Sequence, residues 1–297
     1  MQASTRGWLN GALGVAIFSG SLPATRVAVL GLDPLFVTAA RAALAGILAV
    51  VLLLIGRNQR PTGAEWRTLA LVALGVVLGF PLFTALALRT ITSAHSLVFI
   101  GLLPLATAIF GTWLGGERPS RAFWAFAVLG AASVAGFAFS QDESGSLGAD
   151  ALMMGAILSC GYGYAEGGRL SRRLGGWQVI CWVLVLSLPI SLPLSVILQP
   201  ADWSVVPASA WAGLAYVAVF SMLVGFIFWY RGLALGGIAA VGQLQLLQPF
   251  MGLLLSAWLL GESVTVTMIA VTAFVVACVA GAKYTAAAPT PAPGASV

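Results

Sequence analysis

Residues 104–117 read PLATAIFGTWLGGE, and residues 249–262 read PFMGLLLSAWLLGE. The two stretches lie 145 residues apart and match without a gap at the proline, the Trp-Leu pair and the Gly-Glu pair. Matches between apolar residues alone carry little weight in an apolar chain. Prolines, tryptophans and Gly-Glu pairs at one constant spacing indicate a duplicated segment, and the chain is therefore expected to contain a structural repeat.

The repeat extends outward from these stretches over most of the chain. The same shift of 145 aligns further positions on both sides: Phe83 and Leu88 with Phe228 and Leu233, and Val134-Ala135-Gly136 with Val279-Ala280-Gly281. A shift of 140 aligns Ala16-Ile17-x-Ser19 with Ala156-Ile157-x-Ser159. We therefore expect a first copy at 1–140, a second copy at 148–284, and a disordered tail rich in Ala and Pro at 285–297.

The composition places both copies in a membrane. Hydrophobic residues make up 60% of the chain and charged residues 8%, and the mean hydropathy is +1.01, whereas soluble domains carry about 25% charged residues. The residues form ten apolar runs, most of them close to the roughly 20 residues that cross a bilayer as a helix. The runs are 7–28, 34–56, 66–88, 92–115, 121–140, 148–168, 177–198, 208–230, 235–260 and 264–283.

The basic residues alternate from side to side between these runs. With the N-terminus in the cytoplasm, one side receives 11 of the 14 basic residues: Arg6, Arg57, Arg60, Arg67, Arg118, Arg121, Arg169, Arg172, Arg173, Arg231 and Lys283. The other side receives Arg26 and Arg89, together with the acidic residues Asp142, Glu143, Asp150 and Asp202. Positive charge concentrates on the cytoplasmic side of membrane proteins, so we predict that both termini are cytoplasmic.

Five spans per copy is an odd number, so the second copy must enter the membrane from the opposite side. The predicted fold is an all-α integral membrane protein with ten transmembrane helices arranged as two inverted five-helix repeats. Inverted repeats are typical of secondary transporters, whose substrate site lies between the repeats near the middle of the membrane.

These features resemble the drug/metabolite transporter superfamily, and more narrowly its EamA-type members. The resemblance rests on the Gly-Glu pair after the fourth span of each half (Gly116-Glu117, Gly261-Glu262), the Gly-ended fifth spans, and Asp33-Pro34 leading to Arg41. Within that superfamily the chain looks like the bacterial YddG-type exporters of aromatic amino acids. The resemblance implies export of amino acids, aromatic or hydrophobic, across the bacterial inner membrane by alternating access. One departure is that Cys181 stands where the second half would repeat Arg41.

Polar residues inside the spans are the first candidates for a substrate site, because they are expensive next to lipid. Gln245 and Gln248 share one helical face of the ninth span, and His95 lies in the fourth. Interhelical hydrogen bonding without substrate is the alternative for the two glutamines. For His95 the alternative is a position at the outer interface, paired with solvent or backbone. The repeat-equivalent Ser19 and Ser159 are expected either to line the cavity or to bond the carbonyl four residues earlier.

Aromatic residues near these positions suggest a flat, partly apolar cargo. The candidates for contact with it are Phe80, Phe83, Phe99, Tyr162, Tyr164, Phe228 and Trp229, with helix packing as the alternative. The repeat-equivalent Pro104 and Pro249 lie well inside their spans, where proline permits a kink. We interpret both as hinges, or otherwise as fixed kinks that shape the packing.

The charged residues near the spans have simpler interpretations. We expect Arg41 to reach toward the interface or bond a carbonyl, with a substrate carboxylate as the alternative. Glu166 is expected to pair with Arg169. Glu117 and Glu262 are expected to stabilise the starts of the helices that follow them.

Other classes of function find little support in the sequence. A membrane enzyme is the main rival, but the chain has one histidine and no phosphate-binding loop of the GxxxxGK[ST] type, so we predict no catalytic residues, no metal site and no cofactor. The three cysteines lie in apolar runs and are expected to be buried and unpaired. The predicted partners are a small-molecule substrate and the lipid bilayer, without nucleic acid. Export of another drug or metabolite remains the closest alternative function, and the sequence does not predict an oligomeric state.

Overall fold

The computed structural model describes residues 3–56, 59–115, 120–140, 146–236 and 241–285. These residues form helices joined by short connections and contain no strand. The predicted tail lies outside them from residue 286 onward. In the first half, the described helices are α1 (Ala3–Ser19), α2 (Ser21–Gly31), α3 (Pro34–Ile55), α4 (Gly63–Val72), the π-helix η1 (Ala73–Gly79), α5 (Phe80–Ala87), α6 (Ser93–Ile100), α7 (Leu103–Gly115) and α8 (Arg121–Ser140).

The second half follows the same order of elements. It contains α9 (Ser146–Leu174), α10 (Gly176–Ile197), α11 (Ala208–Ala215), the π-helix η2 (Tyr216–Val224), α12 (Gly225–Gly236), the 3₁₀ helix η3 (Gly242–Leu247), α14 (Gln248–Leu260) and α15 (Val266–Thr285). Helices that continue one another merge into ten helical segments over the described residues, which agree with the ten predicted runs. The chain is an all-α membrane protein.

Several helix starts are encoded by local capping chemistry. The Asp33 carboxylate accepts hydrogen bonds from the backbone N–H of Leu35 at 2.8 Å and of Phe36 at 3.2 Å, and Pro34 supplies the φ angle that suits a first helical residue. The Glu65 carboxylate at the start of α4 accepts from the backbone N–H of Thr62. These bonds satisfy N–H groups that have no partner within the helix, so the helices begin at these residues.

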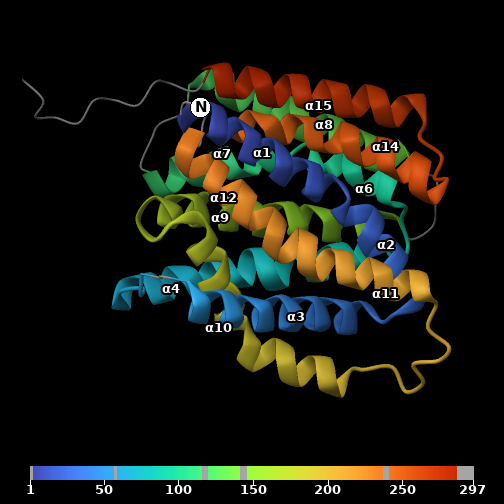
Figure 1. Ribbon diagram of the computed structural model, residues 1–297. Coiled ribbons are helices and arrows are strands. Elements are labelled where there is room, and N and C mark those ends of the chain that lie inside the picture. Colours follow the sequence, from blue (N-terminus) through green and yellow to red (C-terminus); the bar gives the residue numbers. More distant parts are fainter. Residues whose placement is uncertain (1–2, 57–58, 116–119, 141–145, 237–240, 286–297) are drawn as a thin grey trace, which may run out of the picture.

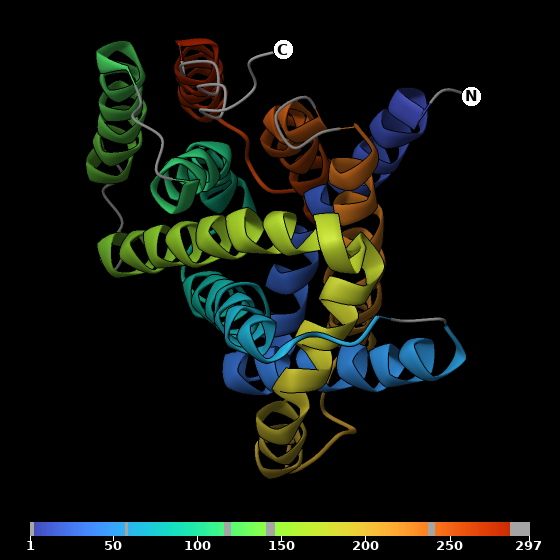
Figure 2. The same cartoon turned by 90° about the vertical axis from the view of Figure 1, so that its left-hand side faces the viewer.

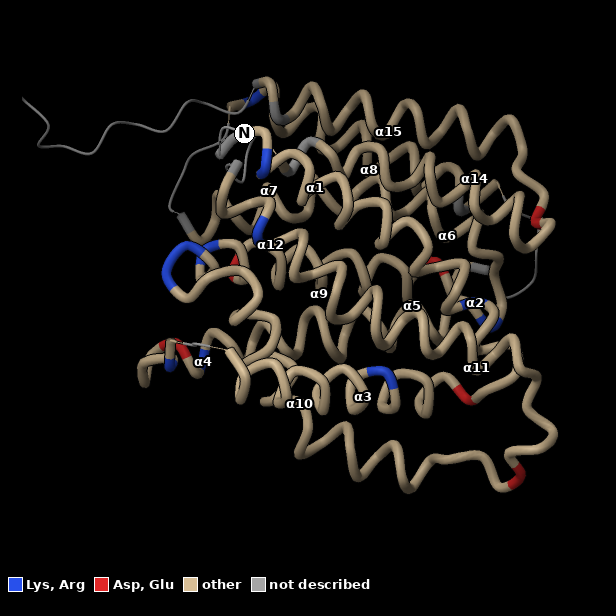
Figure 3. Tube along the Cα trace, in the orientation of Figure 1, with Lys and Arg blue, Asp and Glu red and all other residues tan. Residues whose placement is uncertain are grey.

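The surface of the bundle suits a bilayer. Six of the described helical segments are long and apolar enough to cross a membrane, and three shorter apolar helices accompany them. Large apolar side chains point outward on several elements; Leu54, Ile55 and Trp258 are each about 80% exposed. Lys and Arg gather mainly at the end of the bundle where the N-terminus lies (Figure 3). This pattern is that of a multi-pass membrane protein.

The main helix contacts join one half of the chain to the other. Helix α3 packs along α10, α1 along α12, α8 along α15, and both α5 and α7 along α9, which crosses the bundle obliquely (Figures 1 and 2). The contact between α1 and α12 is close, because a Cβ atom on Gly232 would lie 2.6 Å from the backbone N of Gly11. The interior of the bundle is therefore the interface between the halves.

The helices of each half are interrupted at corresponding places. The π-helices η1 and η2 occupy the third segment of each half, and their last residues, Gly79 and Val224, are 145 residues apart; π-helical turns within helices are frequent at functional sites. The fourth segment breaks at Gly101 and Leu102 before α7, and its counterpart passes through η3 before α14. Pro104 and Pro249 are the second residues of α7 and α14, so each follows directly on an interruption.

Candidate functional site

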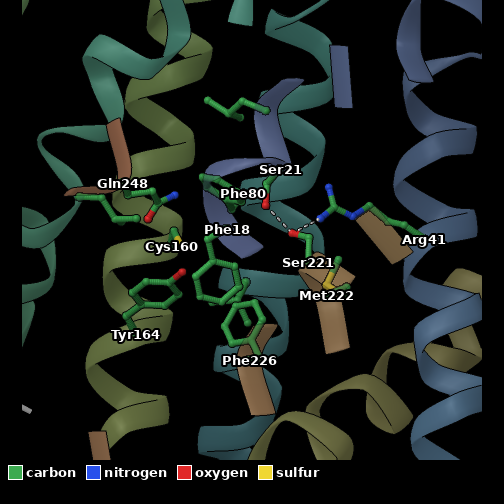
Figure 4. A pocket seen from close by; sticks show the side chains of 13 residues that line it. Phe18, Ser21, Arg41, Phe80, Cys160, Tyr164, Ser221, Met222, Phe226 and Gln248 are labelled. Carbon is green, nitrogen blue, oxygen red and sulfur yellow. Dashed lines mark hydrogen bonds between the residues drawn. The ribbon is translucent and has the colours of Figure 1, made fainter. Parts of the chain in front are cut away.

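A cavity lies between the two halves, at the level of the interrupted helices (Figure 4). Both halves contribute to its lining: Phe18, Ser21, Leu22, Arg41, Val76, Phe80 and Leu103 from the first, and Cys160, Tyr164, Ser221, Met222, Phe226 and Gln248 from the second. Its volume is about 20 Å³, which is room for about one water molecule. The cavity is therefore narrow in this structure.

The lining positions follow the internal repeat. Val76 on η1 and Ser221 on η2 are 145 residues apart, and so are Leu103 on α7 and Gln248 on α14. In each pair the first half supplies an apolar residue and the second half a polar one. These two pairs of equivalent positions therefore face the same cavity, but the two halves give it different chemistry.

One wall of the cavity is polar and contains an arginine. Arg41 on α3 is 3% exposed, and its guanidinium donates to the Ser221 hydroxyl at 3.4 Å. Ser221 also shares a hydrogen bond of 2.7 Å with Ser21. Figure 4 shows the three side chains converging from α3, η2 and α2. The wall presents a positive charge and two hydroxyl groups.

The opposite wall carries an amide and a phenol. Gln248, the first residue of α14, is buried, and its Oε1 atom has no hydrogen-bond partner among the described residues. Tyr164 and Cys160 lie one helical turn apart on α9 and face the same space (Figure 4). An unpaired buried carbonyl oxygen is costly, so Gln248 has the capacity to accept a hydrogen bond from a ligand or a water.

Aromatic rings close the space between these walls. Phe18 and Phe226 meet edge to face with their ring centroids 5.0 Å apart, and Tyr164 lies 5.7 Å from Phe226. Phe80 lines the cavity from α5. The arrangement can enclose a small molecule that has an apolar body and one or two polar groups.

Three of the aromatic and amide candidates from the sequence, Phe80, Tyr164 and Gln248, line the cavity. Ser19 and Ser159 instead donate to the carbonyls of Val15 and Gly155, four residues earlier. Of the two roles that the sequence left open for these serines, the structure shows the backbone bond. Pro104 and Pro249 do not line the cavity, but each neighbours a lining residue, Leu103 and Gln248.

His95 and Phe99 lie at a second location. The His95 Nε2 atom is 2.7 Å from an oxygen of Asp150 on α9, and its ring stacks on Phe99 with centroids 5.9 Å apart. Phe137 closes the other side at 4.9 Å. Asp150, which the charge pattern places in the outer polar group, is only 4% exposed. The structure thus separates these two candidates from Gln248 and gives them a buried acidic partner.

The remaining candidates pack elsewhere. Trp229 is buried beside Phe18 and Tyr164, at 6.4 and 6.1 Å between ring centroids, and so supports the cavity wall from behind. Gln245 is buried on η3 without lining the cavity. Tyr162 meets Phe110, with ring centroids 5.6 Å apart. Phe83 lies against Gly155 on α9.

The charged residues correct two expectations. Arg41 is buried and faces the cavity instead of reaching the interface, and it bonds no carbonyl among the described residues. The Glu262 carboxylate accepts hydrogen bonds from the backbone N–H groups of Ser93 at 3.1 Å and Ala94 at 2.8 Å, so it caps α6 of the other half rather than the helix that follows it. Glu117 lies outside the described residues.

Two expectations about side-chain pairing are confirmed. Glu166 and Arg169 form the expected ion pair at 2.9 Å. Cys160, Cys181 and Cys278 are free and buried.

Comparison with known proteins assigns the arrangement to a family. The model of the EamA-like transporter family matches residues 5–139 and again residues 147–282. The chain belongs to the EamA-like transporter family. It is 60% identical over 283 residues to the uncharacterized transporter YdeK of Bacillus subtilis (strain 168), covering 95% of this chain and 99% of that protein. The chain is therefore a membrane transporter.

Two more distant proteins extend the comparison. Protein PecM of Dickeya dadantii (strain 3937) is 26% identical over 235 residues, which cover 75% of this chain and 73% of that protein. A protein of known crystal structure superposes with a TM-score of 0.65 at 19% identity, over 95% of this EamA-like chain and 99% of that one. The superposition supports the fold.

Sequence reasoning missed most of the polar wall. Ser21 and Ser221 gave a usable signal, because each is a polar residue inside an apolar run. Arg41 gave a stronger one, and the option of a carboxylate contact was open for it. Phe18 and Phe226 gave no signal of their own, since aromatic residues are common in these spans, whereas Tyr164 was among the aromatic candidates.

Proposed function

We propose that this EamA-like transporter exports a small, partly apolar metabolite across the bacterial inner membrane, with aromatic or hydrophobic amino acids as the first cargo to test. The observation that carries the proposal is the narrow cavity between the halves, which is lined by aromatic rings and by polar groups of both halves. A cavity of this kind provides stacking surfaces and a few hydrogen bonds for a molecule such as phenylalanine.

The proposed mechanism is alternating access between two inverted repeats, at about 1–140 and 148–284. Helices α1 and α2 lead away from the end of the bundle where the N-terminus lies, whereas α9 leads back toward that end (Figure 1). Opposite directions of corresponding segments support an inverted relation, which secondary transporters use to open one site to either side in turn.

The small volume of the cavity supports a movement of this kind. Sites for small molecules usually measure about 300–1,000 Å³, so the cavity must enlarge before it takes an amino acid. Rocking of one half against the other would open it, because the main helix contacts run between the halves. Pro104 and Pro249, next to the interruptions in the fourth and ninth segments, are the proposed hinges.

A counterflow experiment tests the function directly. Purified protein in liposomes loaded with unlabelled phenylalanine should accumulate labelled phenylalanine from outside, and a panel of other amino acids and metabolites should compete according to their fit. The same assay with and without a pH gradient reports whether protons take part. Protein-free liposomes are the control. Failure to move any member of the panel would contradict the proposed function.

A further inference from the structure

Arg41 is a buried cation without a matching anion. It is the eighth residue of α3, and its side chain is 3% exposed. Among the described residues no carboxylate lies within ion-pair distance of it, and its Nε atom has no hydrogen-bond partner. Its one hydrogen bond to a side chain, to Ser221, is long at 3.4 Å.

A charge in this position needs a partner. Charged side chains within membrane spans are rare, face the interior of the bundle, pair with one another or with backbone carbonyls, and mark substrate or ion pathways. The guanidinium of arginine presents a planar fork of donors that fits a carboxylate with two parallel hydrogen bonds. In Figure 4 the Arg41 side chain extends from α3 toward Ser221 and the cavity, so a ligand in the cavity can supply the missing anion.

We propose that Arg41, together with the hydroxyls of Ser221 and Ser21, binds the carboxylate of a cargo whose apolar body lies among Phe18, Phe80 and Phe226. This proposal rests on the cavity as the transport site and specifies the class of cargo that the site selects. The preferred ligand is a monocarboxylate with an apolar or aromatic body.

The charge balance sets the order of preference. Arg41 is the one charged residue among the described lining residues. A monoanion neutralises the charge of Arg41. A zwitterionic amino acid leaves one net positive charge in the cavity, and an organic cation leaves two net positive charges there. The Gln248 carbonyl oxygen can accept a hydrogen bond from an ammonium group and so lowers the free-energy cost of burying it, but it carries no negative charge. A phosphate monoester carries close to two negative charges and overcompensates one arginine.

A binding measurement tests the proposal without depending on transport. Full-length protein in nanodiscs is titrated with four related probes, 3-phenylpropionate, L-phenylalanine, 3-phenylpropanamide and phenethylamine, and the affinities are measured by calorimetry. The expected order is 3-phenylpropionate, then phenylalanine, with the amide and the amine at least tenfold weaker than 3-phenylpropionate. Arg41→Gln should weaken 3-phenylpropionate roughly ten- to more than a hundredfold, as expected for lost hydrogen bonds to a charged group, and should leave the amide unchanged.

Two further variants keep the test decisive. Arg41→Lys retains the positive charge but lacks the planar pair of guanidinium donors, so it should bind 3-phenylpropionate with intermediate affinity. This variant replaces Arg41→Gln if Arg41→Gln does not fold. Ser19→Ala, which alters a hydroxyl engaged with its own helix, is the matched control and should leave every affinity unchanged. Equal affinity of the carboxylate for wild type and folded Arg41 variants would overturn the carboxylate site, even if transport is observed. Arginine-dependent binding without transport of any probe would instead overturn the exporter function and leave the site standing.

Discussion

Gln245 and Gln248 lie less than one helical turn apart, yet they meet different surroundings. Gln248 lines the cavity and has an unpaired carbonyl oxygen, whereas Gln245 is buried outside it. We expect Gln248→Ala to raise the KM for the transported metabolite roughly two- to tenfold, the effect of one neutral hydrogen bond. Gln245→Ala should leave KM unchanged. Uptake kinetics in proteoliposomes measure both values.

The pair of glutamine variants also has an informative opposite outcome. A larger change in KM for Gln245→Ala than for Gln248→Ala would place the cargo beside η3 and not in the described cavity. Melting temperatures of the two variants provide the control, because both amides are buried and both substitutions leave a space in the interior.

At the scale of single residues, the sequence identifies which side chains are unusual but not which partner each one meets. His95 was conspicuous as the one histidine of the chain, but its partner Asp150 is 55 residues away on a different helix. Arg41 and Ser221 are 180 residues apart. Such pairs arise from packing between the halves, and one sequence contains no record of that packing.

The His95–Asp150 pair connects two elements, α6 of the first half and α9 of the second. Asp150→Ala would leave the buried imidazole without its partner between Phe99 and Phe137, at a cost of about 1–3 kcal/mol. The melting temperature should therefore fall by about 2–12 °C. Asp202→Ala in an exposed loop, where the carboxylate bonds only Ser204, should leave it unchanged. Equal melting temperatures for Asp150→Ala and wild type would show that the pair does not stabilise the junction.

The interrupted fourth and ninth segments are the elements expected to move. Pro104 and Pro249 cannot donate a backbone hydrogen bond, and their rings interfere with the preceding turn, so replacement by alanine would favour a continuous helix through each interruption. Pro104→Ala and Pro249→Ala should each lower the maximal transport rate more than they change KM. Pro61→Ala, in a connection between helices, is the matched control. Unchanged maximal rates in both variants would exclude a hinge role for these prolines.

At the scale of the whole molecule, periodicity and repeats were enough to predict the ten helical segments. Hydrophobic length fixes the span of a helix in a bilayer, and capping residues such as Asp33 fix where some helices begin. The π-helices η1 and η2 were not predicted, because no residue type marks them. A site between the repeats was predicted, but most of its lining was not, since the lining combines residues of both halves that are ordinary within their own helices.

The orientation of the whole molecule in the membrane is open to a direct test. Basic residues concentrate at one end of the bundle (Figure 3), and positive charge favours the cytoplasmic side. Reporter fusions after Gln59 and Arg172 should therefore report the cytoplasm, and a fusion after Asp202 the opposite side. Transfer of several arginines across the membrane is strongly unfavourable, so the signal should be nearly complete in each case. A periplasmic signal at Gln59 together with a cytoplasmic signal at Asp202 would show that the orientation is the reverse of the predicted one, and the proposed direction of transport would have to be reversed with it.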